Sequence, residues 1–364
     1  MPLIVDSHQD LAWNMLTFGR DYTRSAEETR QIEQGTPTIA RNGDTLLGWP
    51  DYQRGQVSVI FVTLFSTPAR WAFAWETVFY KDTAQAKEQY NQQLDMYHKL
   101  TDEHPDKFRV ISSASSLDDL LASQKEAISA GQTYPVGLVP LMEGSDCIEH
   151  PDEVESWHER GLRIIGPAWA GTRYCGGTNE PGPLTKEGRL LLEIMAEQGF
   201  TLDISHMDEK AALQALDSYE GAIIATHANC LSLLPGSDSN RHLSDRVIQS
   251  LIERDGVMGV IPFNRFLKPG WLLSASSRRE EISLDMLAAH IDHICQIAGN
   301  TNHTAIGSDF DGGFGLQATP IEIDTIADLQ KLQPLLAARG YSQTDIDAIL
   351  GKNWLNQLHK TLTQ

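Results

Sequence analysis

LIVDSHQD, residues 3–10, decides the fold, because its apolar run ends in two side chains that bind metals, His8 and Asp10. Later segments repeat this pattern of an apolar run followed by His, Asp or Glu. They are VGLVPLMEG with Glu143, FTLDISH with His206, GAIIATH with His227 and TAIGSDFDG with Asp309. In a barrel of parallel strands, the C-terminal ends of all strands lie at one face. Side chains that follow the strands can therefore meet there and form one metal site.

Strand-like and helix-like segments alternate along nearly the whole chain, which is typical of a parallel α/β fold. Fully apolar runs such as VSVIFVTLF and GAIIAT indicate strands buried on both faces. We therefore predict an α/β fold, a (β/α)8 TIM barrel of the metal-dependent hydrolase type. Its strands are expected near residues 3–8, 56–66, 136–143, 162–168, 200–205, 221–227, 256–262 and 304–308, with a short extra strand near 108–113.

No linker, repeat or low-complexity stretch divides the chain, so residues 1–364 are predicted to form one catalytic barrel domain. Residues 19–55 are expected to be an irregular loop over the active face, and about 341–362 to form C-terminal helices. The aromatic segment WAFAWETVFY, residues 71–80, follows the second strand. Packing in a core or an interface is its default interpretation, and lining of a pocket is the alternative.

The composition limits the partners of the protein. The chain has 364 residues, of which 41% are hydrophobic and 21% charged, and its formal net charge is -20. This acidity argues against nucleic acid and against anionic membrane surfaces as partners. No signal-peptide pattern or membrane-spanning run is evident, and the four scattered cysteines suit buried, reduced thiols. We therefore expect a cytoplasmic protein with no membrane partner.

The residue types at the strand ends suit a metal centre. His8 and Asp10 are two positions apart on a strand and therefore point to the same side. Glu143 has two carboxylate oxygens, with which it can bridge two cations, and His206 and His227 supply imidazoles, which suit zinc. Each residue also has an ordinary interpretation, as a turn cap, a salt bridge or a hydrogen-bonded core histidine. Their repetition in one register favours the metal site.

Two further side chains suit the chemistry of hydrolysis. Asp309 and Asp311 both lie in GSDFDGG, and Asp309, nearer the strand end, is predicted to be the general base. An Asx turn is the alternative for this pair. Arg241 in NRHLSD is predicted to bind a substrate carboxylate through both arms of its guanidinium group, although a surface arginine is the simpler interpretation. The remaining histidines considered are expected to be solvated: His98, His104, His158, His290, His293, His303 and His359.

These motifs together resemble those of a known family. DSHQD, MEG, LDISHM, THANC, NRHLSD and IGSDFDGG occur in the order and spacing of the membrane (renal) dipeptidase family, peptidase family M19 of the amidohydrolase superfamily. The resemblance extends from about residue 3 to GYSQTDIDAILGKNWL. It implies a zinc-dependent dipeptidase that acts on dipeptides, including those with a D-residue at the C-terminal position, through a metal-bridging hydroxide. Members are commonly homodimers, which leaves a homodimer open here.

The resemblance also implies roles for individual residues. Two Zn²⁺ ions would be held, one by His8, Asp10 and Glu143 and the other by Glu143, His206 and His227. Asp309 would be the proton-transfer base, and Arg241 would bind the terminal carboxylate of the substrate.

Two positions depart from the family pattern. Trp169 stands where the renal enzyme has a histidine that polarises the scissile carbonyl, and Phe263 stands in place of a substrate-contacting tyrosine. We expect Trp169 to contact substrate, and Arg173 or Tyr174 are candidates for stabilising an oxyanion. These changes keep open a related binuclear amidohydrolase acting on another amide or lactam. A metal-binding barrel without dipeptidase activity is the third hypothesis.

Overall fold

The computed structural model describes residues 1–273 and 277–363. A barrel of parallel strands forms its centre, and the strands follow one another around it in chain order. They are β1 (Ile4–Gln9), β2 (Val57–Leu64), β6 (Val136–Glu143), β7 (Ile164–Gly166), β10 (Thr201–Asp203), β11 (Ile223–Ile224), β12 (Met258–Val260) and β13 (Thr304–Ile306). The barrel closes where Ala225, just after β11, pairs with Met258 of β12. The predicted (β/α)8 barrel is therefore confirmed.

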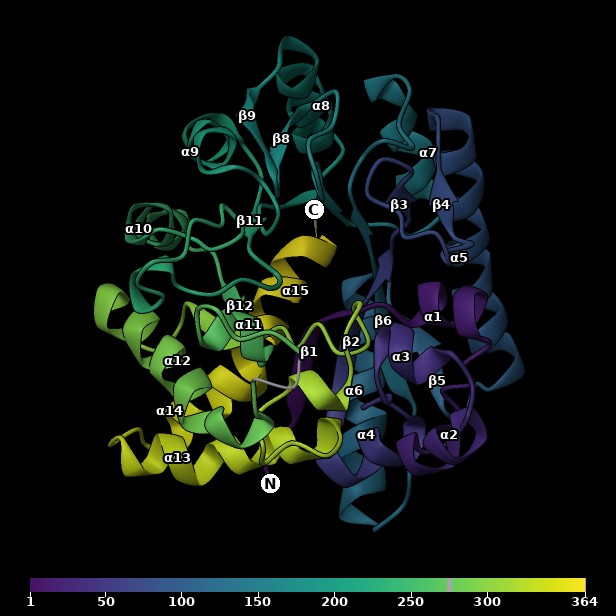
Figure 1. The fold of residues 1–364 in the computed structure, drawn as a ribbon, viewed down its shortest axis with the longest axis vertical. Coiled ribbons are helices and arrows are strands. Elements are labelled where there is room, and N and C mark those ends of the chain that lie inside the picture. Colours follow the sequence, from purple (N-terminus) through teal and green to yellow (C-terminus); the bar gives the residue numbers. More distant parts are fainter. Residues whose placement is uncertain (274–276, 364) are drawn as a thin grey trace.

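Helices surround the strands (Figure 1). In chain order they are α1 (Leu11–Phe18), α2 (Ala26–Glu33), α3 (Thr38–Asn42), α4 (Trp49–Gly55), α5 (Thr83–Glu103), α6 (Ala114–Ser129), α7 (Val154–Glu159), α8 (Lys186–Glu197), α9 (Glu209–Ser218), α10 (Asp245–Glu253), α11 (Asn264–Leu267), α12 (Leu284–Ala298), α13 (Leu332–Ala338), α14 (Gln343–Asp347) and α15 (Asn353–Thr363). Within the described residues, no helix combines the length and apolar composition needed to cross a membrane.

Short strands supplement the barrel. The extra strand predicted near 108–113 is present as β5 (Phe108–Val110), which pairs with the first residues of β6. Two small ribbons were not predicted from the sequence. They are formed by β3 (Thr67–Pro68) with β4 (Phe79–Tyr80), and by β8 (Cys175–Gly177) with β9 (Glu180–Leu184).

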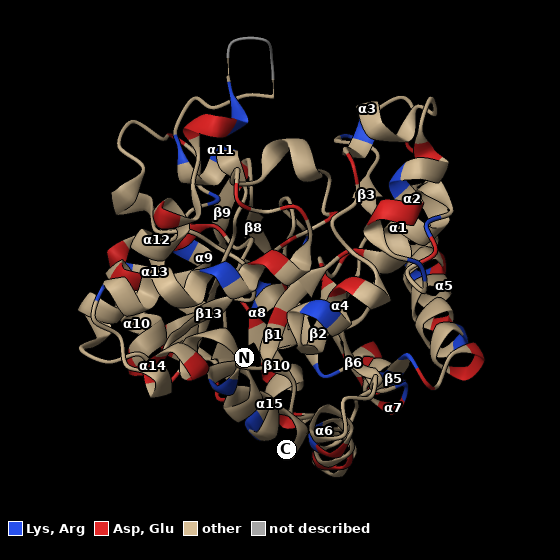
Figure 2. Ribbon diagram, turned by 90° about the horizontal axis from the view of Figure 1, so that it is seen from below, with Lys and Arg blue, Asp and Glu red and all other residues tan. Residues whose placement is uncertain are grey.

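The inside of the barrel is a packed apolar core that is closed at one end by α15. Val5, Phe61 and Val139 belong to one buried cluster with Trp354 of α15. The indole N–H of Trp354 donates to the carbonyl of Ile306 at 2.8 Å, and its ring packs against Phe61 at 5.3 Å. In Figure 2, α15 lies at the side of the molecule opposite α3 and α11. The other end of the barrel, at the C-terminal ends of the strands, is therefore the one available for a site.

Residues 19–55 are not the irregular loop that the sequence suggested. This segment contains α2, α3 and α4, and α2 begins with a capping box between Ser25 and Glu28. The polar composition of the segment hid these helices. The buried face of α2 is formed by Ala26, Thr29 and Glu33, of which two are polar, so it does not stand out as an apolar stripe.

Asp311 is the main anchor of this segment. Its carboxylate is fully buried, lies 3.0 Å from Nη1 of Arg20, and accepts hydrogen bonds from Tyr22, Thr45 and the backbone N–H of Leu46. A buried carboxylate is costly unless it is paired, and here every partner comes from the segment 19–55. Asp311 therefore ties this segment to the end of β13.

Asp311→Asn should lower the free energy of unfolding by about 3 kcal/mol, because the buried guanidinium of Arg20 loses one of its two carboxylate partners, the other being Glu33, and because the hydrogen bonds from Tyr22, Thr45 and Leu46 lose their charged acceptor. Asp324→Asn is the matched control. It removes an ion pair with Arg30 in which the Asp324 side chain is 68% exposed, and it should cost less than about 1 kcal/mol. Urea unfolding of the two variants and the parent protein gives the comparison. Equal losses would contradict the anchoring role of Asp311.

Candidate metal centre

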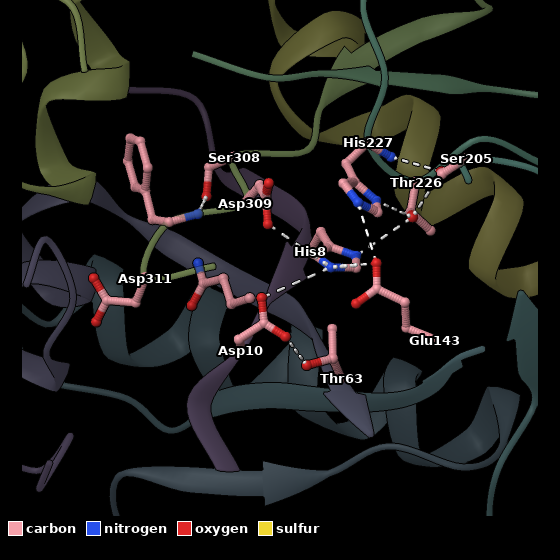
Figure 3. A network of polar contacts seen from close by, with 12 residues as sticks. His8, Asp10, Thr63, Glu143, Ser205, Thr226, His227, Ser308, Asp309 and Asp311 are labelled. Carbon is pink, nitrogen blue, oxygen red and sulfur yellow. Dashed lines mark hydrogen bonds and ion pairs between the residues drawn. The ribbon is translucent and has the colours of Figure 1, made fainter. Parts of the chain in front are cut away.

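The polar side chains predicted from the strand ends meet at one rim of the barrel, where Figure 3 shows His8, Asp10, Glu143, His227 and Asp309. His8 lies in β1 and Asp10 just after it, and Glu143 is the last residue of β6. His206, His227 and Asp309 follow β10, β11 and β13. All except Asp309 are classed as buried, and the Asp309 side chain is only 15% exposed.

Glu143 occupies the middle of the group. Its Oε1 atom lies 3.0 Å from Nε2 of His206, 3.4 Å from Nε2 of His227 and 3.5 Å from Nε2 of His8. The Nε2 atoms of His206 and His227 are themselves 3.0 Å apart. Three imidazole nitrogens thus converge on one carboxylate oxygen, an arrangement typical of ligands around a cation.

His8 extends the group toward two more carboxylates. Its Nε2 atom lies 4.0 Å from Oδ2 of Asp10 and 4.0 Å from Oδ1 of Asp309. This nitrogen is buried, and it has no hydrogen-bond partner within residues 1–273 and 277–363. A buried polar atom without a partner is rare, and a bound metal would satisfy it.

Threonine hydroxyl groups orient the candidate metal ligands by contacting the imidazole nitrogens that face away from the centre. Thr178 Oγ1 lies 2.9 Å from Nδ1 of His206, and Thr226 Oγ1 lies 2.9 Å from Nδ1 of His227. Thr63 donates to Asp10. Such contacts fix the orientation of an imidazole ring and leave its Nε2 atom to bind a metal.

The electrostatics also favour a bound cation. Burial alone would lower the pKa of His8, but the carboxylates of Glu143, Asp10 and Asp309 raise it to about 10. Burial raises the pKa of Asp10 to about 6, although His8 opposes this shift. Burial and the nearby Arg241 lower the pKa of His206 to about 4, so that its imidazole is neutral. Clustered carboxylates beside a neutral imidazole are the donors that a divalent ion binds.

The geometry brings together both ligand sets implied by the family resemblance. Glu143, His206 and His227 have donor atoms within 3.4 Å of one another, and His8 is near both Asp10 and Glu143. Asp309 joins His8 and Asp10 in a further group whose donor atoms all lie within 4.8 Å. The residue predicted to be the base is therefore also close enough to be a metal ligand.

The backbone around Asp309 is adapted to this crowding. Asp309 adopts a left-handed conformation with φ of 57°, which is uncommon for residues other than glycine and often occurs at functional sites. A Cβ atom on Gly312 would lie 2.1 Å from Oδ1 of Asp309 and 2.7 Å from Oδ2 of Asp10. Glycine at this position therefore allows the two carboxylates to approach. Asp311, the other aspartate of GSDFDGG, points away into the 19–55 segment.

Arg241 lies beside the metal centre and is almost completely buried. Its Nη1 and Nη2 atoms donate to the carbonyl oxygens of Ser205 and His227, both at 2.8 Å. These bonds fix the guanidinium group at the wall of the cavity. Each Nη atom has a second N–H, so this arrangement is compatible with the predicted carboxylate binding.

Trp169 also lies at the cavity wall, where its ring packs 5.2 Å from Phe65 and 6.2 Å from His206. The suggestion that Arg173 or Tyr174 stabilises an oxyanion is wrong. Arg173 points outward to Glu187, and the hydroxyl of Tyr174 donates to the carbonyl of Ile148. Neither residue lines the cavity.

The cavity above the metal centre has a volume of about 630 Å³. Much of its wall is aromatic, and the segment 71–80 contributes Trp71, Phe73 and Trp75. Pocket lining, the alternative for this segment, is therefore correct for these three residues, whereas Val78 packs in a buried cluster with Trp13 and Phe65.

Three polar residues were missed by the sequence-based prediction or were assigned the wrong environment. Glu76 and His242 line the cavity and are buried, but neither follows a strand directly, so the strand-end pattern did not select them. His290 was expected to be solvated, yet it is 2% exposed and its Nδ1 accepts the backbone N–H of Cys230. It lies on the inner face of α12, between the apolar residues Ala289 and Ile291.

Comparison with known proteins agrees with this geometry. The family model for membrane dipeptidase, peptidase family M19, matches residues 1–363. The chain belongs to this family. The predicted enzyme class, a hydrolase of the metallodipeptidase type, is thus confirmed at the level of the family.

Individual relatives are more distant. An uncharacterised protein in the pqqA 5′ region of Klebsiella pneumoniae is 32% identical over 222 residues, which is 58% of this chain and 77% of that protein. The dipeptidase tcpJ of Claviceps purpurea is 25% identical over 279 residues, which is 74% of this chain but 59% of that relative.

Solved structures share the fold along the whole chain. A dipeptidase described as a metallo peptidase of family M19 has a TM-score of 0.78 at 23% identity, covering 100% of this chain and 99% of its own. A metallo peptidase of Rhodobacter sphaeroides has a TM-score of 0.77 at 22% identity, covering 99% of both chains. At these identities the similarity supports the fold alone.

Proposed function

We propose that this protein is a dipeptidase that hydrolyses the peptide bond of dipeptides with two Zn²⁺ ions. The observation that carries the proposal is the convergence of three imidazole Nε2 atoms on Oε1 of Glu143. Imidazole and carboxylate are the ligands that suit zinc, and a carboxylate with two oxygens can serve two ions.

The metal ligands of the proposal are those implied by the family resemblance. His8, Asp10 and Glu143 would hold one ion, and Glu143, His206 and His227 would hold the other. The chemistry that bound zinc would supply is a water nucleophile that is active at neutral pH. The Thr178 and Thr226 hydroxyl groups keep the imidazoles oriented for this task.

The remaining residues position the substrate and move its proton. Asp309 lies beside His8 and is the proposed acceptor of the proton that leaves the attacking water, and later its donor to the leaving amine. Burial raises the pKa of Asp309 well above its usual value, which suits a group that must both take and give a proton. Arg241 would bind the terminal carboxylate, and Trp169 would pack against the substrate beside His206.

The substrate class rests on relatives. The fold relative from Rhodobacter sphaeroides was crystallised with a phosphinate mimic of the dipeptide L-Ala-D-Ala. We propose that this protein likewise accepts dipeptides of the L-Xaa-D-Xaa type. A related binuclear amidohydrolase acting on another amide or lactam is the second candidate, favoured by Trp169 in place of the family histidine. A metal-binding barrel without dipeptidase activity is the third.

The cellular setting belongs to the proposal as well. A net charge of -20 and four buried cysteines without disulfides suit a cytoplasmic enzyme acting on small molecules. No partner other than a small substrate is required, and a homodimer is compatible with the proposal.

Zinc-loaded protein incubated with a panel of L,L and L,D dipeptides should release free amino acids, which mass spectrometry can follow. A chelator should abolish turnover, and added zinc should restore it. Loss of turnover on every dipeptide, with zinc still bound, would contradict the dipeptidase proposal and favour hydrolysis of another amide, which a panel of lactams and N-acyl amino acids would then examine.

Asp309→Asn should lower kcat by about 10²–10⁴-fold, because the amide cannot accept the proton. Zinc content, measured by mass spectrometry of the metal, should decrease little. Asp238→Asn is the control, since Asp238 lines the same cavity but is exposed at its mouth. If Asp309→Asn kept near-normal kcat, another group would have to be the base.

A further inference from the structure

Glu76 is a buried carboxylate in the cavity for which the proposed hydrolysis has no use. The residue is 8% exposed and lies in the aromatic segment between β3 and β4. Its Oε1 atom accepts the backbone N–H of Phe73 at 3.0 Å. Its Oε2 atom is buried and has no hydrogen-bond partner in the described part of the chain. Glu76 therefore lacks the partners that buried carboxylates usually have.

The wall around Glu76 is made of aromatic rings. Phe73 and Trp75 precede it in the chain and stack with their ring centroids 5.9 Å apart, and Trp13 lies edge-on to Trp75 at 6.4 Å. The same cluster continues through Phe65 to Trp169, which adjoins His206. An aromatic wall with one carboxylate thus extends from the mouth of the cavity to the metal centre.

This combination suits a cationic ligand group. A carboxylate with a free oxygen forms a charge-assisted hydrogen bond with an ammonium group, and aromatic faces attract cations through their quadrupoles. Shielding from water strengthens the first of these interactions, since Glu76 is 8% exposed, whereas Phe73 of the wall is 66% exposed. One cation of the protein already uses this wall, since the guanidinium of Arg41 lies over the Trp75 ring at 5.2 Å, but it forms no ion pair with Glu76 among the described residues. An anionic or purely apolar group at this place would leave the buried charge of Glu76 uncompensated.

The barrel topology indicates which end of a substrate would lie there. Glu76 follows β2, and Arg241 follows β11. Between β2 and β11 stand β6, β7 and β10 on one side of the barrel, and β1, β13 and β12 on the other. The two residues therefore belong to opposite sides of the rim, with the metal centre between them. A dipeptide whose carboxylate is bound by Arg241 would direct its amino-terminal residue toward Glu76.

We propose that Glu76 and its aromatic wall form a specificity subsite for a cationic nitrogen on the amino-terminal residue of the substrate. That nitrogen is either the α-ammonium group or the ammonium of a basic side chain, since both have the required chemistry. The inference rests on the proposed dipeptidase function for the orientation of the substrate.

Four acyl derivatives of one carboxyl-terminal amino acid separate these two sources. The acyl groups are L-lysyl, with both nitrogens; L-norleucyl, with the α-nitrogen alone; 6-aminohexanoyl, with the side-chain nitrogen alone; and hexanoyl, with neither. The carboxyl-terminal residue is the one that supports turnover in the dipeptide panel, or D-alanine if none does.

Glu76→Gln removes the charge and retains an oxygen that can accept the Phe73 N–H. KM should rise about tenfold to a hundredfold for each compound that carries the engaged nitrogen, as expected for one lost charge-assisted hydrogen bond. KM for the hexanoyl compound and zinc content should be unchanged. A rise for the norleucyl but not the 6-aminohexanoyl compound would identify the α-ammonium group, and the reverse would identify the side chain.

Asp238→Asn, which removes a carboxylate at the exposed mouth of the same cavity, is the matched control and should preserve the differences among the four compounds. The melting temperature of Glu76→Gln should equal or exceed that of the parent, because the substitution removes an unpaired buried charge. Equal KM values for all four compounds in the parent protein would overturn the proposal even if the variant failed to fold, as would equal effects of Glu76→Gln on all four.

Calorimetry separates this proposal from the proposed activity. Binding of the four compounds to zinc-loaded protein is measured with and without Glu76→Gln in the Asp309→Asn background, where turnover is suppressed. A charge-dependent loss of affinity without any turnover in the parent would retain the cation subsite and reject the dipeptidase. Turnover in the parent protein without a charge-dependent loss of affinity in Glu76→Gln would support the dipeptidase and reject the cation subsite.

Discussion

The position of Glu143 among three imidazoles is the interaction on which the site depends. A closed barrel of parallel strands forces the strand ends to one rim, so side chains from distant parts of the sequence must share a small volume. There, a buried carboxylate is tolerable because His8, His206 and His227 surround it. The same crowding leaves His8 Nε2 without a hydrogen-bond partner among the described residues, which a metal ion would relieve. The barrel fold therefore creates the crowding of polar side chains that a bound metal ion would stabilise.

The cavity above this centre is electrostatically polarised. Among its buried groups, Arg241, fixed by two backbone carbonyls, provides positive charge on the β11 side, and Glu76 provides a carboxylate on the β2 side. Arg41 and Asp238 add exposed charges to the same cavity, and Arg41 lies over the Trp75 ring at 5.2 Å. A zwitterionic substrate lying across the metal centre would match the two buried groups, with its carboxylate at Arg241 and its ammonium at Glu76. These two groups would therefore favour one orientation of a small flexible molecule in a wide, largely aromatic cavity.

The sequence predicted the barrel and its strand ends because these follow from local patterns. Buried parallel strands are apolar runs, and the residues after them must lie at the rim, so His8 and Glu143 could be found without a structure. The helices of residues 19–55 could not be predicted from the sequence, because Asp311, the residue that anchors them, is distant in the chain. Glu76 was also missed, because its significance lies in its burial beside aromatic rings, and the burial of a single glutamate within an aromatic segment cannot be read from the sequence. Trp169 could be placed at the site only through the resemblance to a family.

Zinc titration of metal-free protein, with turnover of one dipeptide measured at each point, tests the central claim most directly. The account predicts no turnover without metal and a rise that saturates at two equivalents of zinc per chain, because Glu143 and its neighbours provide ligands for two ions. Saturation at one equivalent would contradict the bridging role of Glu143, and turnover in the absence of metal would contradict the assignment of the strand-end residues to a metal centre.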